Sequence, residues 1–95
     1  MGKVILRGYI QVPVGDLEAV RAELDNHIRL TRAEEGCLVF EVVQDSEDRC
    51  RFAVYEEFSD RASFDLHQAR VKASTWGEVT AGVARHYEII GAGDH

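Results

Sequence analysis

Proline, cysteine and basic residues are all scarce in this sequence. Its 95 residues include 1 proline and 2 cysteines, and 17 acidic against 11 basic residues give a net charge of −6. An acidic chain without a basic run cannot neutralise many phosphates, so we expect no nucleic-acid partner. No stretch approaches the ~18 consecutive apolar residues of a membrane span, so we expect no membrane partner. The N-terminal apolar stretch is too short and interrupted for a signal peptide, and we expect a cytoplasmic protein.

The two cysteines predict neither a disulfide nor a metal site. Cys37 and Cys50 fall at opposite ends of a predicted hairpin, roughly 20 Å apart at ~3.3 Å per residue. That separation is beyond disulfide reach, so we expect free thiols in a reducing compartment. No histidine stands near them at ligand spacing, which argues against zinc. Glycine-rich phosphate loops, nucleotide fingerprints and nucleophile-elbow motifs are also missing, so an enzyme of this composition must let its substrate supply the reactivity.

What is present is an alternation of strand and helix patterns. Alternating or continuous apolar residues predict strands, and an apolar stripe beginning at Leu17 predicts a helix with Asp16 as N-cap and Gly36 as C′ residue. Ser59 or Asp60 is the expected N-cap of a second helix. Ser74-Thr75 looks like the cap of a further short helix over 76–83. The strands are expected over residues 3–12, 37–43, 50–58 and 85–90, and residues 91–95 as a frayed tail.

This order, β-α-β-β-α-β, is typical of an α+β, ferredoxin-like fold. It predicts one domain, residues 1–95, with a four-stranded antiparallel sheet and helices on one face. The strands are apolar on both alternations: Phe52, Val54 and Phe58 share one side, and Ala53 and Tyr55 the other. A chain this small rarely leaves such a face in water, so we expect a homodimer formed through the open sheet face.

The stretch 51–76 gathers most of the groups that could do chemistry together. His67 falls on the apolar face of the second helix, at helical spacing from Phe64 and Val71. A partly buried imidazole near neutral pKa can take or return a proton, so His67 is our first catalytic candidate. A core histidine bonded to a backbone carbonyl is the alternative for that position.

Three further features join the candidate site. Asn26 and His27 lie at the border of the first helix's apolar stripe and could reach the same layer as His67, or could be a surface pair. On the third strand, Tyr55, Glu56 and Glu57 alternate, and the pattern leaves open which glutamate faces the helices. A strand carboxylate aimed at the histidine could fix its tautomer. The aromatic residues that could line a pocket for a planar ligand are Phe40, Phe64 and Trp76.

These residues carry a family resemblance. The segment LTRAEEGCLVFEVVQD, followed by RFAVYEEFSDRASFDLHQAR, resembles the antibiotic biosynthesis monooxygenase domain, including its quinol monooxygenases. The resemblance covers nearly the whole chain, and the EEGCLVFEV junction, the VYEEF strand and the FDLH helix are together fairly specific. It implies a dimeric α+β barrel. It also implies oxidation of a phenolic, quinol or anthrone-like substrate by O2 without flavin, haem or metal.

The same resemblance implies roles for individual residues. His67 matches the family's recurrent helix histidine, Asn26 and His27 match a polar pair found in some members, and Tyr55 and Trp76 would orient the ring. Glu57, Phe64 and Phe40 complete the expected substrate-binding set.

One departure from the family pattern keeps other functions open. Many members carry a second histidine or aromatic shortly after the helix histidine, where this chain has Arg70-Val71-Lys72. Those cations would suit a phosphorylated or acidic substrate, as in the branch that processes phosphorylated autoinducer-2, which shares the Asn-His pair. A non-catalytic ligand-binding dimer is the third alternative. The haem-degrading branch is disfavoured because the first strand offers Gln11 and no asparagine.

Overall fold

The order of strands and helices is the predicted one, with a short 3₁₀ turn added. The computed structural model describes residues 2–91. Its elements are β1 (Val4–Gln11), η1 (Val14–Asp16), α1 (Leu17–Arg32), β2 (Cys37–Gln44), β3 (Arg51–Phe58), α2 (Arg61–Lys72), α3 (Thr75–Val79) and β4 (Ala84–Gly91). The predicted strand limits are therefore correct to within one residue at each end. The predicted tail is different: Gly91 is the last residue of β4, and residues 92–95 lie outside the described part.

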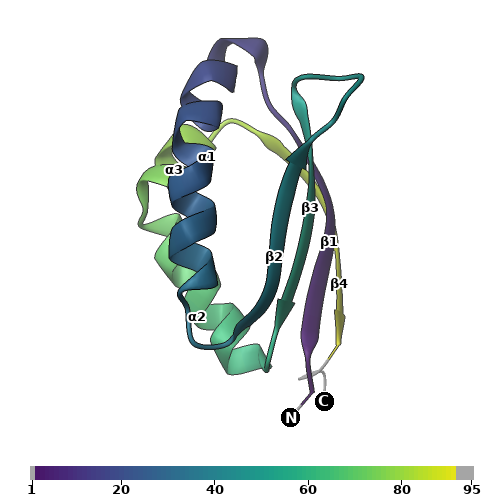
Figure 1. Cartoon of the computed structure of the whole chain (residues 1–95), viewed down its shortest axis with the longest axis vertical. Coiled ribbons are helices and arrows are strands. Elements are labelled where there is room, and N and C mark those ends of the chain that lie inside the picture. Colours follow the sequence, from purple (N-terminus) through teal and green to yellow (C-terminus); the bar gives the residue numbers. More distant parts are fainter. Residues whose placement is uncertain (1, 92–95) are drawn as a thin grey trace.

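The four strands form one antiparallel sheet in the order β2-β3-β1-β4. All three helices lie on one face of this sheet, and the other face is bare (Figure 1). This is the predicted α+β, ferredoxin-like fold. The central strands β1 and β3 pair along their whole length, from Val4 opposite Phe58 to Gln11 opposite Arg51.

Strand alternation decides which side chains face the helices. On β3 the buried residues are Phe52, Val54, Glu56 and Phe58, so every second residue points to the helical layer. The core is completed from β1 and the helices, chiefly by Val4, Leu6, Ile10, Val20, Phe64 and Trp76. Burial of these apolar side chains, at roughly 25 cal/mol per Å² removed from water, is the main stabilising contribution. Glu56 is the one acidic member of this buried β3 row.

The helix caps follow the sequence at two ends and differ from it at two others. The side chain of Asp60 accepts a hydrogen bond from Ser63 N, and Ser74 accepts one from Gly77 N, as expected of N-caps. Asp16 holds the N-cap position of α1, but its side chain makes no cap bond, because η1 leads directly into the helix. The predicted C′ role of Gly36 is wrong, since α1 is capped by Ala33.

Gly36 and Gly8 lie where a second segment passes too close to leave room for a side chain. A Cβ at Gly36 would lie 2.1 Å from Ser63 Oγ, so this glycine lets the chain after α1 pass against α2. Gly8, with φ of 152°, lies in the middle of β1, and a Cβ there would lie 1.9 Å from the carbonyl oxygen of His86 on β4. At both positions the missing Cβ lets elements that are distant in sequence approach closely.

Two further predictions concern the thiols and the membrane. Cys37 and Cys50 are both free, as predicted, and lie at opposite ends of the β2–β3 hairpin. Within residues 2–91, no helix combines the length and the apolar character needed to cross a bilayer.

Candidate functional site

The imidazole of His67 is buried between two carboxyl groups. Its side chain is 3% exposed, on the face of α2 that packs against the sheet. Nδ1 lies 2.9 Å from Oε1 of Glu34, within hydrogen-bond distance. Nε2 lies 3.8 Å from Oε1 of Glu56, too far for a hydrogen bond. Burial lowers the pKa of His67, and the charge and hydrogen bond of Glu34 oppose that shift.

Glu34 is held in place by a second partner. The Nε atom of Arg70, one turn after His67 on α2, donates to Oε2 of Glu34. The same guanidinium group donates from Nη2 to Oγ1 of Thr31 at 3.0 Å. Because an ion-paired carboxylate only accepts hydrogen bonds, His67 must donate through Nδ1–H. Neutral His67 therefore carries its free lone pair on Nε2, on the side of Glu56.

Glu56 is a buried carboxyl group in an apolar row. Its neighbours across the sheet are Leu6 on β1 and Phe40 on β2. Burial, and next the charge of Glu34, raises the pKa of Glu56 from 4.5 to about 8. Oε1 of Glu56 is buried without a hydrogen-bond partner among the described residues. At neutral pH the group is therefore mostly a neutral acid that can donate a proton in a hydrogen bond.

His27 brings a second imidazole to the same layer from α1. Its ring stacks on Trp76, with centroids 4.4 Å apart and planes inclined by 2°. The rings of His27 and Phe40 are nearly perpendicular, with centroids 5.2 Å apart, and the centroid of the His67 ring lies 6.3 Å from that of His27. Burial, followed by the charges of His67 and Arg70, lowers the pKa of His27 to about 3. His27 is therefore a neutral, largely aromatic wall, and its Nδ1 is buried without a partner in the part of the chain described.

A cavity of about 180 Å³ lies between these side chains and the end of the helical layer. Every helix and every strand contributes to its wall. The polar members are His27, Glu56, His67, Gln68, Arg85 and Tyr87, and the aromatic members include Phe40 and Trp76. The volume is below the ~300–1,000 Å³ of most small-molecule sites, so the cavity suits a small planar ring.

The structure brings together some of the predicted site residues and separates others. His67, His27, Trp76 and Phe40 line the cavity. The other predicted residues lie outside its wall. Asn26 binds Glu23 and Arg29 on α1 itself, and Phe64 packs its ring against Phe58.

Tyr55 and Glu57 lie on the opposite face of the sheet. There the hydroxyl of Tyr55 and the ammonium group of Lys3 both donate to the Glu57 carboxylate. The cause is strand alternation: Glu56 shares the face of Phe52 and Phe58, which places Tyr55 and Glu57 on the bare face. The expected contact of Tyr55 and Glu57 with the pocket of His67 is therefore not formed within this chain.

Sequence reasoning missed Glu34 and Arg85, and it gave Arg70 a different role. Glu34 and Arg70 meet because the loop after α1 passes α2. No local sequence pattern predicts this contact. Arg85 lines the cavity from β4 and donates through Nη2 to the carbonyl and hydroxyl oxygens of Thr80, each at 3.1 Å. Arg70 was considered for a phosphorylated substrate, but its guanidinium group is bound to Glu34 and Thr31. Glu56 could have been assigned from the sequence, since Phe52, Val54 and Phe58 fix its face.

Metal ligation is a separate question from proton transfer. Among residues 2–91, no group of three or more histidine, cysteine, aspartate or glutamate side chains is arranged to hold a metal ion.

The fold has many solved relatives, and three illustrate the similarity. A candidate antibiotic biosynthesis monooxygenase from Bacteroides thetaiotaomicron is 27% identical, with a TM-score of 0.75, over 97% of this chain and 88% of that one. One from Nitrosomonas europaea is 23% identical, with a TM-score of 0.78, over 96% and 89% of the two chains. One from Deinococcus radiodurans is 21% identical, with a TM-score of 0.78, over 97% and 94%.

No curated protein matches the chain. The family model described as antibiotic biosynthesis monooxygenase matches residues 3–78, which include β1, both long helices, the central hairpin and the buried His67. The chain belongs to the antibiotic biosynthesis monooxygenase family.

Proposed function

We propose that the protein is a cofactor-independent monooxygenase that oxidises a small phenolic, quinol or anthrone-like substrate with O2. The observation that carries the proposal is His67, whose Nδ1 binds Glu34 while Nε2 faces the neutral acid Glu56 beside an aromatic cavity. Family membership supports a monooxygenase-like reaction. The substrate class and the use of O2 rest on the chemistry of these residues.

His67 acts as the general base. Its lowered pKa keeps the ring neutral at physiological pH, and Glu34 selects the tautomer whose lone pair is on Nε2. The hydroxyl proton of a phenol, or the acidic C–H proton of an anthrone, passes to Nε2. The imidazolium that forms is stabilised by the Glu34 carboxylate, which is anchored by Arg70.

Glu56 stabilises the anion left on the substrate. A carboxyl group with a pKa of about 8 is protonated at neutral pH and donates a hydrogen bond to the oxyanion. The electron-rich anion then supplies the electrons that reduce O2. One oxygen atom enters the product and the other leaves as water, so the substrate is the only reductant. The stacked pair His27 and Trp76 forms a wall for the ring and excludes water.

The test is oxygen uptake with an anthrone and with a menadiol-type quinol. We expect protein-dependent uptake, and a decrease of about 100-fold or more in His67→Ala, the range for loss of a positioned base. The control is Leu66→Ala, which removes an exposed side chain of α2 that lines neither the cavity nor the bare sheet face. Heat-denatured protein gives the rate of spontaneous oxidation.

Each outcome of this test has a distinct meaning. Uptake equal in wild type and His67→Ala contradicts the proposed base. Turnover of a phosphorylated diketone without oxygen uptake would instead favour the autoinducer-2 processing reaction. Binding of aromatic compounds without turnover, in both the wild type and His67→Ala, would favour the alternative of a non-catalytic ligand-binding dimer.

The proposal includes a homodimer paired through the bare sheet face. On that face Val43, 61% exposed, lies opposite Ala53, and Ile90, 37% exposed, lies opposite Ile5. Exposed apolar side chains on an uncovered sheet face favour a second copy as the covering layer. Sedimentation equilibrium should give a dimer that Ala53→Glu dissociates. Leu66→Glu, a charge placed on α2 outside that face, should leave it intact, and a monomeric wild type would contradict the assembly.

A further inference from the structure

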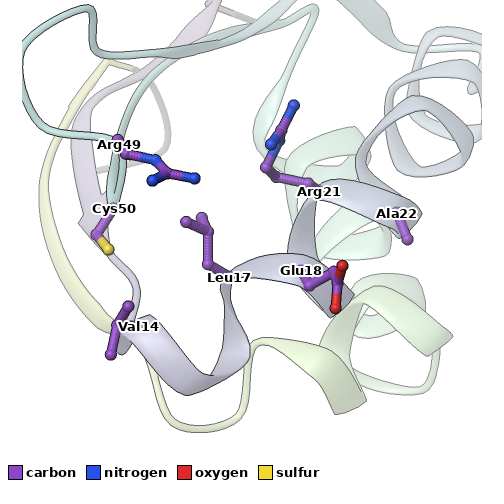
Figure 2. Close-up of a pocket in the computed structure, with 7 residues that line it drawn as sticks. All are labelled: Val14, Leu17, Glu18, Arg21, Ala22, Arg49 and Cys50. Carbon is purple, nitrogen blue, oxygen red and sulfur yellow. The ribbon is translucent and has the colours of Figure 1, made fainter.

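A larger hollow lies at the opposite end of the helical layer from Gly36. It has a volume of about 540 Å³ and is bounded by η1, the first two turns of α1 and the β2–β3 loop. None of its lining residues belongs to the cavity around His67. Figure 2 shows Arg49 reaching from the loop toward α1, with Leu17 below it and Arg21 rising from the helix on the far side. The volume falls within the ~300–1,000 Å³ typical of small-molecule sites.

Arg21 and Arg49 differ from the other arginines of the chain. Each of the others uses its guanidinium group in a hydrogen bond or ion pair. Within residues 2–91, Arg21 and Arg49 have no such partner, and both line this one hollow. In a chain of net charge −6, two unpaired cations at one place form a local site for an anion.

The two aspartates near Arg49 are engaged in other hydrogen bonds. Asp48 accepts from the backbone N–H of Cys50 at 3.0 Å and from Gln11 at 3.1 Å, and Asp45 accepts from the backbone N–H of Glu47 at 2.8 Å. These bonds fix the loop and leave the Arg49 guanidinium group directed over the hollow. Glu18 also lines it, but in Figure 2 its carboxylate lies away from both guanidinium groups.

The rest of the lining is apolar. Val14, Leu17 and Ala22 provide hydrocarbon surface, and the thiol of Cys50 lies at the margin. Val14 is 80% exposed, so its side chain is open to contact with a ligand in the hollow. A ligand that satisfies both parts of the wall must have one anionic group and an apolar body.

We propose that this hollow is a second binding site, for a small amphipathic carboxylate. Arg21 and Arg49 hold the carboxylate by charge-assisted hydrogen bonds, and Leu17, Ala22 and Val14 cover its hydrocarbon part. The site is separate from the cavity of the proposed oxygenase reaction, and it stands whether or not that reaction is confirmed.

Isothermal titration calorimetry with octanoate tests the site. We expect saturable binding that weakens about tenfold in Arg21→Gln or Arg49→Gln, as loss of one charged hydrogen bond predicts. Arg61→Gln is the matched control, because it removes an exposed cation that is paired with Asp65 on α2. Octanoate should also slow the reaction of Cys50 with a thiol reagent in a Cys37→Ser background. His67→Ala should bind octanoate as the wild type does.

Several results would overturn the proposal. Affinity unchanged in both arginine variants, or no saturable binding to the folded wild type, would remove the anion site. Equally tight binding of 1-octanol would show that charge plays no part, and equally tight binding of inorganic phosphate would show that the apolar wall plays none. Loss of binding in His67→Ala would place octanoate in the other cavity.

Discussion

Nε2 of His67 and Oε1 of Glu56 face each other at 3.8 Å, in a layer that excludes water. The two atoms are too far apart to share a proton directly, and close enough for one substrate hydroxyl group to contact both. A base and a neutral acid on either side of one small cavity are what proton removal from a phenol requires.

Glu56→Gln should change how stability depends on pH. The folded chain keeps the Glu56 proton up to about pH 8, whereas the unfolded chain loses it near 4.5. Between these values the folded state binds more protons, so the free energy of unfolding falls as pH rises. The variant should lack that fall and be more stable at pH 8 by about 2–4 kcal/mol. Urea denaturation from pH 5 to 9 measures this, and Glu57→Gln, on the opposite face, should keep the wild-type slope.

Glu34→Gln should weaken the control over the His67 tautomer. An amide can donate as well as accept, so Nδ1–H is no longer required, and kcat should fall roughly 10–100-fold with little change in KM. The ¹⁵N NMR signals of His67 should move from one tautomer toward a mixture. Glu35→Gln, an exposed neighbour, is the control. A His67 spectrum unchanged in Glu34→Gln would rule out the positioning role.

His27→Leu should improve stability in acid. The folded chain resists protonation of His27 until about pH 3, whereas the unfolded ring accepts a proton near 6.5. Between these values the unfolded state binds more protons, so the free energy of unfolding falls as pH decreases. The free energy of unfolding of the variant should therefore decrease less than that of the wild type as the pH is lowered from 6.5 to about 3. Fluorescence of Trp76, the single tryptophan, reports unfolding. An acid transition that stays at the wild-type pH in His27→Leu would contradict the assignment.

Gly36→Ala should destabilise the fold although the residue lies in a loop. The new Cβ would meet Ser63 at 2.1 Å from Oγ and 2.3 Å from Cβ, a clash that costs roughly 1–3 kcal/mol. Ser63→Gly should restore part of that loss in the double variant, whereas Ser63→Ala should not, because its Cβ remains. Gly15→Ala is the control: nothing lies within 4 Å of a Cβ there, and urea denaturation should show little change.

The fold and the buried position of His67 could be predicted from the sequence because both depend on local patterns. Alternation and caps gave the βαββαβ order, and the spacing of Phe64 and Val71 placed His67 against the sheet. The position of Glu56 was also available, since it shares its alternation with Phe52 and Phe58. What could not be predicted depends on where distant segments meet. Glu34 reaches His67 because Gly36 permits the loop to pass α2, and neither residue signals this contact alone.

The alternation of β3 also limits how the chain can vary in length. Glu56 and Glu57 are consecutive, yet one is a buried neutral acid and the other an anion paired with Lys3. Inserting or deleting one residue within the strand would exchange their environments, placing a charge in the core and exposing Phe52 or Phe58. A change of length beside β3 can be accommodated only outside the strand, and the loop between β2 and β3 is the connection that precedes it. That loop carries Arg49, so an insertion there would alter the hollow beside α1 and leave the cavity of His67 intact.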